Sequence, residues 1–487
     1  MEKQGAEGSL KKRLLAYAES DYYGFHMPGH KRQMGELGNP YQIDITEIDG
    51  FDDLHHPQAQ GILAQAQARA ARLYGAEETH FLINGSTAGI LSAISGCTSF
   101  GGRLLMARNS HRSAYHGAGL RNLKLSYLYP QTEETLWING GISPKDVENS
   151  LKEHPELEAV FLTSPTYEGI CTDVKTAAEI CHRYNIPLIV DQAHGAHFPF
   201  CEWFPEDALR AGADVVIESV HKTLPALTQT ALLHMQGNLV DRERVRYYLS
   251  VYQSSSPSYV LMASVDSCME QLEREGSVLF GAYQKRLERF RESCKSLKRL
   301  RLAGQEIVGT ASIYDFDPSR LVISTGNTSM TGMSLMRKLR CQYHLEMEMA
   351  AEDYVIGISS VADREEDFER LSRALHELDE VEGERCADVS SRENRNIRQL
   401  QRGEAVLTLG EALECQKEWA KLEEAEERIS GAYLYVYPPG IPVVIPGEKL
   451  TGRLCRQIAR WAAEGRELHG LDEKGRIPVI RCGHTNQ

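Results

Sequence analysis

The sequence lacks the features that mark several large protein classes. Its eleven cysteines are scattered singly and no two have C-x-x-C spacing, which argues against a zinc ribbon and a disulfide framework. No apolar run approaches the ~20 residues needed to cross a bilayer. The segment Met1–Tyr17 has no apolar signal-peptide core. We therefore expect a cytoplasmic protein with free thiols and no membrane partner.

A basic surface is also missing. Lys and Arg number 54 against 68 Asp and Glu, a formal net charge of −14. This balance excludes a general binder of nucleic acid, which normally carries a basic footprint. It suits small cationic ligands, which an acidic protein attracts. With 487 residues, 42% hydrophobic and 25% charged, the chain is long enough for several packed domains.

From Pro57 to His234 short apolar runs alternate with helical patterns, which predicts a mostly parallel sheet covered by helices on both faces. The expected strands are His80–Ile83, Leu104–Ala107, Leu125–Tyr129, Ala159–Thr163, Leu188–Val190, Val215–Ile217 and Ala231–Met235. The expected helices are Pro57–Tyr74, Ser86–Cys97, His111–Gly119, Pro144–Glu153, Asp173–Tyr184 and Pro205–Ala211.

The rest of the chain predicts an amphipathic helical bridge over Asp241–Arg299 and two smaller α+β units. The further expected elements are strands Leu321–Ser324, Tyr354–Ser359 and Tyr433–Val436 and helices Gly332–Tyr343, Glu365–Leu378, Val406–Ala425 and Leu450–Glu464. We predict an N-terminal segment (1–56), a large domain (57–300), a small α+β domain (301–380), a charged linker (381–403) and a C-terminal α+β domain (404–487).

Polar motifs follow several of the expected strands, where ligands bind in open parallel sheets. The first is the run Asn84 to Gly89, in which Gly85, Ser86 and Thr87 open a helix. Free backbone N–H groups and hydroxyls at a helix start can hold a phosphate. The alternative is a Ser cap after a turn.

The second motif runs from Asp191 to His197 after an apolar strand. A buried Asp is costly unless it pairs with a cation, and the alternative is an Asp that caps the next turn. A metal site is disfavoured because His194 and His197 lie on an irregular loop, so we expect no metal.

The third and fourth motifs supply an amine and an imidazole. Lys222 follows Ser219 and His221 at a strand end, and a desolvated Lys becomes a Schiff-base nucleophile. His111 lies at a helix start, where it could stack on a planar ring or act as a cap.

Together these motifs describe a pyridoxal-phosphate site. The cofactor needs a phosphate cradle, a carboxylate for its pyridinium nitrogen, a stacking group and a lysine for its aldehyde. The residues that match these needs, in that order, are Gly85, Ser86, Thr87 and Ser219; Asp191; His111; and Lys222.

The chain resembles the bacterial ornithine/lysine/arginine decarboxylase family in its short form, without an N-terminal receiver-like wing domain. The matching motifs are Phe25–Lys31, Asp52–His55, Asn84–Gly89, Arg108–His111, Asp191–His194, Ser219–Lys222, Gln253–Pro257 and Pro438–Pro442. The resemblance implies an aminotransferase-like fold of type I and decarboxylation of arginine, lysine or ornithine to agmatine, cadaverine or putrescine. The chain departs from the family pattern at Leu224–Leu227, where many relatives are rich in glycine.

The resemblance also implies further site residues and a homodimer, with higher assembly left open. Ser255 would reach the partner subunit's cofactor, His194 would lie against the ring, and His221 would steer the carboxylate or donate a proton. The expected substrate-binding residues are His26, His30, Asp52, Asp53 and Glu448. The alternatives are an aminotransferase, an aldolase, a cysteine desulfurase or a cofactor-binding regulator without catalysis. The regulator is disfavoured because Lys222 and Asp191 are both kept.

Overall fold

The computed structural model describes residues 17–32, 37–45, 48, 51–136, 138–381, 403–436, 441–463 and 468–481. The predicted charged linker, apart from its ends, and residues 438–440 of the Pro-rich motif lie outside these ranges. No helix among the described residues has the length and apolar character required to cross a membrane.

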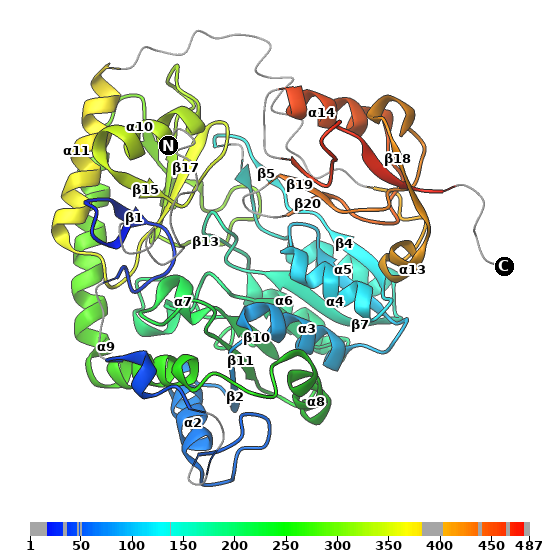
Figure 1. The fold of residues 1–487 in the computed structure, drawn as a ribbon, viewed down its shortest axis with the longest axis horizontal. Coiled ribbons are helices and arrows are strands. Elements are labelled where there is room, and N and C mark those ends of the chain that lie inside the picture. Colours follow the sequence, from blue (N-terminus) through cyan, green and yellow to red (C-terminus); the bar gives the residue numbers. More distant parts are fainter. Residues whose placement is uncertain are drawn as a thin grey trace.

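The described residues contain a seven-stranded sheet in the order β2-β11-β10-β9-β7-β3-β4, with β11 antiparallel to both neighbours and the other pairings parallel. Its strands are β2 (Glu78–Leu82), β3 (Arg103–Ala107), β4 (Lys124–Leu128), β7 (Leu157–Thr163), β9 (Leu188–Asp191), β10 (Val215–Glu218) and β11 (Ala231–Met235). Each predicted strand of the large domain is therefore confirmed, as is the mostly parallel α/β fold (Figure 1).

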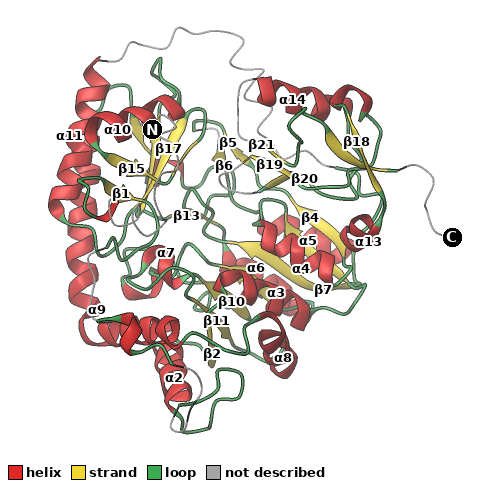
Figure 2. Ribbon diagram, in the orientation of Figure 1, coloured by secondary structure: helices red, strands yellow, loops and turns green. Residues whose placement is uncertain are grey.

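The two faces of this sheet bury two separate cores, because successive strand residues point to opposite faces. Leu105 and Val160 belong to one core, which α2, α6 and α9 cover (Ile62–Tyr74, Val174–Arg183 and Tyr259–Cys294). Leu104 and Phe161 belong to the other core, beneath α3, α4 and α8 (Gly85–Cys97, Arg112–Leu120 and Arg242–Tyr252). Burial on both faces explains why the strands read as unbroken apolar runs. Figure 2 shows this layering of helices on the strands.

Local signals fix several helix ends. Gly75 ends α2 in the left-handed conformation, with φ of 76°, and its N–H binds the carbonyls of Ala71 and Arg72. The Asp173 side chain accepts from the Thr176 N–H at the start of α6. The remaining helices of the large domain are α5 (Pro144–Glu153) and the short α7 (Val220–Thr223).

A second sheet, in the order β12-β14-β17-β16, forms the core of the small α+β unit. Its elements are β12 (Arg301–Leu302), β14 (Arg320–Ser324), α10 (Gly332–Tyr343), β15 (Leu345–Met347), β16 (Met349–Ala350), β17 (Tyr354–Ile358) and α11 (Glu365–Val381). The N-terminal strand β1 (Tyr23–Phe25) pairs with β15 in parallel, which attaches the N-terminal segment to this unit. Short two-stranded pairings complete this part: β5 with β6 (Thr132–Glu133, Ile138–Asn139) and β8 with β13 (Ile170–Cys171, Asp315–Phe316).

The C-terminal unit corrects one expectation. The predicted helix over Val406–Ala425 is wrong, because only α13 (Leu409–Glu414) is helical before a strand begins. The capping box of Thr408 and Glu411 starts α13, as a local signal would. The other elements of this unit are β18 (Lys417–Ala420), β19 (Leu434–Val436), β20 (Pro442–Val444), α14 (Gly452–Ala463), β21 (Leu468–His469) and β22 (Ile477–Ile480).

Two further helix predictions also needed correction. Pro205–Ala211 forms turns rather than a helix, because the Asp207 carboxylate accepts from the Leu209 and Arg210 N–H groups and holds a local turn. The helical stretch of 241–299 is interrupted at residues 253–258, between α8 and α9. The predicted domain boundaries stay predictions.

The sheet brings the sequence motifs to one edge. In a parallel sheet the carboxyl ends of the strands lie together, and here β2, β3, β7, β9 and β10 all end at that edge. Their ends are followed by Asn84, Arg108, Ser164, Gln192 and Ser219.

Candidate active site

Lys222 and His194 form the centre of the site. Lys222 lies in α7, directly after β10, and His194 lies in the loop that follows β9. The Nζ atom of Lys222 is 2.9 Å from Nε2 of His194. The edge of Tyr167, from the turn after β7, packs against the His194 ring with centroids 4.9 Å apart. Adjacent strands thus bring an amine, an imidazole and a phenol together.

Arg320 fixes the protonation of His194. Arg320 is fully buried at the start of β14, and its Nη2 donates to the His194 carbonyl at 2.7 Å and to Nδ1 at 3.1 Å. Because a guanidinium only donates, Nδ1 carries no proton, and the proton of the neutral ring is on Nε2. Burial lowers the pKa of His194 well below its usual value, and the Lys222 charge adds to this. The Nε2–H can therefore donate to Lys222 when the amine is neutral, because an ammonium has no lone pair to accept it.

The environment of Lys222 favours that neutral amine. Burial lowers its pKa to about 8; the Asp191 charge opposes this shift, Arg320 adds to it and Glu348 opposes it. A neutral amine is the nucleophilic form that reacts with an aldehyde.

Asp191 is a buried carboxylate that forms no ion pair with another described residue. It ends β9, is 3% exposed, and one oxygen accepts from the Ala193 N–H at 3.1 Å. Burial raises its pKa, and the Lys222 charge lowers it. The side chain is therefore suited to a protonated ring nitrogen, which would hold the carboxylate in its charged form.

The residues of the predicted phosphate cradle lie at the start of α3 and at the end of β10. α3 begins at Gly85, where φ is 72°, and Asn84 provides no side-chain cap. Ser86 and Thr87 lie in its first turn. The buried Ser219 hydroxyl has no hydrogen-bond partner among the described residues. Backbone N–H groups and a spare hydroxyl are what a phosphate would engage.

The other two predicted histidines have distinct environments. His111 is the N-cap of α4, with Nδ1 2.8 Å from the Ser113 hydroxyl, and its ring is exposed. Partial desolvation and then the Lys222 charge lower its pKa to about 3. His221 binds the Thr230 carbonyl through Nδ1 at 2.8 Å, and burial lowers its pKa to about 4. Its Nδ1 carries the proton, because a carbonyl oxygen only accepts.

The N-terminal segment reaches this group after β1. The Gly29 N–H donates to the His221 carbonyl at 2.7 Å, which brings the segment to the residue before Lys222. His26 lies beside it, with Nε2 3.1 Å from the Tyr17 hydroxyl. His30 accepts from the Arg32 N–H through Nδ1 at 2.9 Å. His26 is thus partnered within the segment, and His30 binds the segment's own backbone.

The predicted substrate acids bind groups of the chain itself. Asp52 accepts from the Leu63 N–H at 3.1 Å at the start of α2, and Asp53 accepts from the His55 N–H at 2.8 Å. Glu448 is buried 3.5 Å from Arg108, with its Oε2 also accepting from the Ile445 N–H at 3.0 Å. The acids whose charge acts on Lys222 are Asp191 and Glu348.

Ser255 is exposed in the connection between α8 and α9.

Three residues of the site were missed from the sequence: Arg320, Glu348 and Tyr167. Arg320 and Glu348 come from the small α+β unit. The pattern of strand ends in the large domain does not indicate which residues of the small unit face Lys222. Tyr167 lies at a strand end, in Ser164-Pro165-Thr166-Tyr167, so its position in the sequence could have found it.

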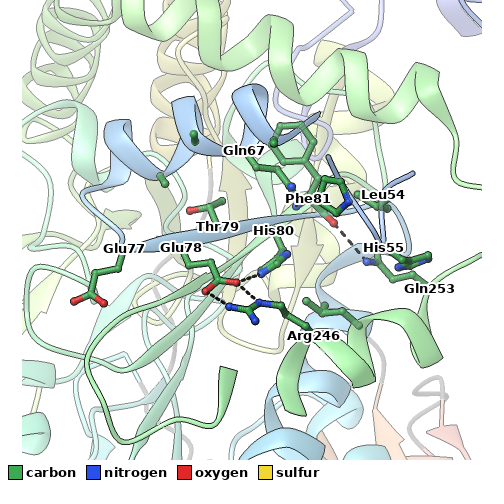
Figure 3. Close-up of a pocket in the computed structure, with 15 residues that line it drawn as sticks. Leu54, His55, Gln67, Glu77, Glu78, Thr79, His80, Phe81, Arg246 and Gln253 are labelled. Atoms are coloured by element: carbon green, nitrogen blue, oxygen red, sulfur yellow. Dashed lines mark hydrogen bonds and ion pairs between the residues drawn. The ribbon is translucent and has the colours of Figure 1, made fainter. Parts of the chain in front are cut away.

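A pocket of about 310 Å³ lies apart from the Lys222 group, between α2, β2 and α8. Figure 3 shows Glu78 bound to His80 and Arg246 at its edge, and Gln253 directed to the Phe81 backbone. The side-chain oxygen of Gln253 accepts from the Ile83 N–H at 2.8 Å. The lining residue Gln253 therefore binds the backbone at the end of β2, and Lys222 and His194 do not line this pocket.

Comparison with known proteins identifies relatives over most of the chain. The family model described as Orn/Lys/Arg decarboxylase, major domain, matches residues 9–324, and that of the C-terminal domain matches residues 404–472. The arginine decarboxylase of Halalkalibacterium halodurans is 32% identical over 470 residues, 94% of each chain. That of Bacillus subtilis is 32% identical over 475 residues, 96% of each chain. The constitutive lysine decarboxylase of Escherichia coli is 24% identical over 602 residues, 96% of this chain and 81% of the relative.

Solved structures share the fold. The Escherichia coli constitutive lysine decarboxylase has a TM-score of 0.77 at 20% identity, covering 97% of this chain and 81% of the other. An alanine–glyoxylate aminotransferase from Nostoc sp. has a TM-score of 0.52 at 14% identity, covering 65% and 86%. A structure described as SPT with PLP has a TM-score of 0.50 at 14% identity, covering 64% and 75%.

Proposed function

The chain belongs to the Orn/Lys/Arg decarboxylase family, and we propose that its substrate is arginine. It is a pyridoxal-phosphate-dependent decarboxylase of a basic amino acid. The proposed reaction breaks the Cα–carboxylate bond of arginine, releases CO₂ and places a proton on Cα to give agmatine. Arginine is favoured because two relatives at 32% identity are named arginine decarboxylases, whereas the Escherichia coli lysine decarboxylase is 24% identical.

We propose that the residues at the carboxyl edge of the sheet hold pyridoxal phosphate. Gly85, Ser86, Thr87 and Ser219 would hold the phosphate, Asp191 the ring nitrogen, Lys222 the aldehyde carbon, and His111 and His194 the ring. The unpartnered Ser219 hydroxyl and the Asp191 carboxylate without a cation fit this group. When bound, the cofactor supplies an electron-accepting ring for the electron pair of the broken Cα–carboxylate bond.

The protein's own residues manage the protons. Arg320 orients His194 so that its Nε2–H faces Lys222, which stabilises the neutral form of the amine and positions it. After the bond breaks, we assign to Lys222 the return of a proton to Cα, because a group with a pKa of about 8 exchanges protons readily near neutral pH. His221 is less suited, because its only proton is bound to the Thr230 carbonyl.

We also propose a cytoplasmic homodimer in which Ser255 reaches the cofactor of the partner subunit. The support is the exposure of Ser255 between α8 and α9, together with the family resemblance. Size measurement in solution tests the dimer, and a monomer that decarboxylates arginine at full rate would contradict the shared site.

The observation that carries the proposal is the Lys222–His194 pair at the sheet edge in a chain similar to arginine decarboxylases along its length. The test is incubation of the cofactor-loaded enzyme with arginine, lysine and ornithine in parallel, following CO₂ and the amine product. We expect agmatine from arginine at the highest kcat/KM. Preferential cadaverine or putrescine formation would overturn the choice of arginine. Inertness toward all three, or a keto acid product, would overturn the proposed activity.

A further inference from the structure

Glu348 is an acid at the active site that the proposed cofactor contacts leave unused. It lies between β15 and β16, in the small α+β unit. One carboxylate oxygen accepts from the Tyr167 hydroxyl at 2.5 Å, and the other accepts from the Met27 N–H at 3.0 Å. The side chain is partly exposed. It is therefore held in a defined orientation by two neutral donors and still borders open space.

In the described part of the chain, no cation pairs with Glu348. Its two partners are a phenol and an amide, and each carboxylate oxygen can accept a further hydrogen bond. The other acids near the site are engaged differently. Asp317 lies 3.3 Å from His197 and near Arg320, and Glu168 accepts from Tyr354 and Thr166. Asp191 is assigned to the ring nitrogen.

Glu348 also lies near the reacting amine. The ring of Tyr167, whose hydroxyl binds Glu348, packs against His194, and His194 contacts Lys222. The electrostatics agree, because the Glu348 charge favours the protonated form of Lys222. Met27 comes from the segment whose Gly29 binds the His221 carbonyl, so Glu348 lies where that segment passes the Lys222 helix.

We propose that Glu348, oriented by Tyr167 and Met27, binds the distal cationic group of the substrate and thereby selects basic amino acids. This inference rests on the proposed function. A carboxylate with both oxygens fixed can accept two parallel hydrogen bonds from a guanidinium, whereas an ammonium makes a point contact. The carboxylates of Asp52, Asp53 and Glu448, which the sequence predicts for substrate binding, are engaged at a helix start, a turn and Arg108, and their role stays a prediction.

The test compares Glu348→Gln with wild type. Gln keeps an oxygen that can accept from one of the two donors but removes the charge. Loss of one charged hydrogen bond predicts a ~10–100-fold rise in KM for arginine and in the inhibition constant of agmatine, with kcat changed much less. Agmatine is informative because it keeps the guanidinium and lacks the carboxylate. Glu346→Gln is the matched control, because Glu346 lies on the adjacent strand and pairs with Arg340 at 3.0 Å.

A neutral analogue separates charge recognition from a structural role. Citrulline carries an uncharged urea in place of the guanidinium, so Glu348→Gln should reduce discrimination between arginine and citrulline. Unchanged KM and agmatine inhibition in Glu348→Gln would overturn the proposal. So would a fall in kcat with both constants unchanged, which would indicate that Glu348 only positions the N-terminal segment.

Binding of agmatine by calorimetry keeps this test independent of turnover. If the wild type binds agmatine and Glu348→Gln binds it ~10–100-fold more weakly, the inference holds even if no amino acid is decarboxylated, and only the proposed reaction fails. Equal binding by both proteins, or binding by neither, overturns the inference.

Discussion

Nζ of Lys222 lies 2.9 Å from Nε2 of His194. Because Arg320 donates to the other nitrogen of His194, this contact becomes a hydrogen bond from the imidazole to the amine when Lys222 is neutral. The arrangement prepares Lys222 as a nucleophile before any ligand arrives.

The reactivity of Lys222 should rise with pH and level off above about 8. Since its pKa is lowered to about 8, about a tenth of the amine is neutral at pH 7, far more than for an ordinary lysine. The rate at which cofactor-free enzyme binds pyridoxal phosphate, followed by absorbance, measures this. His194→Ala should move the midpoint upward, because water would enter where burial now disfavours the ammonium. A wild-type midpoint above pH 10 would contradict the account.

Replacing Asp191 by Asn should separate catalysis from folding. Asn keeps the shape but loses the charge proposed for the ring nitrogen, so kcat should fall by ~10²–10³-fold. The melting temperature of the cofactor-free protein should not fall, because burial raises the pKa of Asp191 and a neutral group is favoured there. Activity assays and thermal unfolding check the two parts. Full activity of Asp191→Asn would refute the assigned role.

Arg108 should matter more for stability than its partner Glu448. The Arg108 guanidinium is 1% exposed, donates to the Pro442 and Val443 carbonyls and the Tyr115 hydroxyl, and lies 3.5 Å from Glu448. Arg108→Ala should lower the free energy of unfolding by about 3–5 kcal/mol, as expected when a buried charge network loses one member. Glu448→Gln should cost less, because Gln keeps an acceptor and burial already raises the pKa of Glu448. Urea unfolding of both variants gives the order, and the reverse order would contradict it.

Glu78 should stabilise the large domain in a pH-dependent way. Burial raises its pKa, but the hydrogen bonds from His80 and Arg246 outweigh burial and lower it to about 2 (Figure 3). A lowered carboxyl pKa stabilises the fold fully above the unfolded value near 4.5, and this contribution is lost as the pH falls toward 2. At pH 7, Glu78→Gln should therefore be less stable than wild type by about 1–3 kcal/mol. A difference that persists unchanged at pH 2.5 would argue against this origin.

The sheet of the large domain could be predicted because its signals are local. Inner strands such as β9 and β10 are apolar runs buried on both faces, and helices of this domain begin and end at caps such as Asp173 and Gly75. Two of the three helix predictions that needed correction fail where distant contacts decide the structure. Asp207 holds a turn and also receives the Gln192 amide at 2.5 Å, and β18 pairs with β22, which follows much later in the chain. Neither partner can be read from the local sequence.

The residues of the site also fall into those that the local sequence predicts and those that it does not. Lys222, Asp191 and Ser219 could be proposed because each follows a buried strand, and the parallel topology brings such ends together. Arg320 and Glu348 come from the small α+β unit, so only the packing of the two units places them near His194 and Tyr167. The partner of Asp52 could not be predicted either, because its carboxylate accepts from the Leu63 N–H at the start of α2.

The central claim is that Lys222 binds pyridoxal phosphate. Borohydride reduction of the cofactor-loaded enzyme, followed by peptide mapping, tests it most directly. We predict one modified peptide, which contains Lys222, and no modified peptide from Lys222→Ala treated in parallel. A label on any other lysine, or an unmodified Lys222 in enzyme that decarboxylates arginine, would contradict the account.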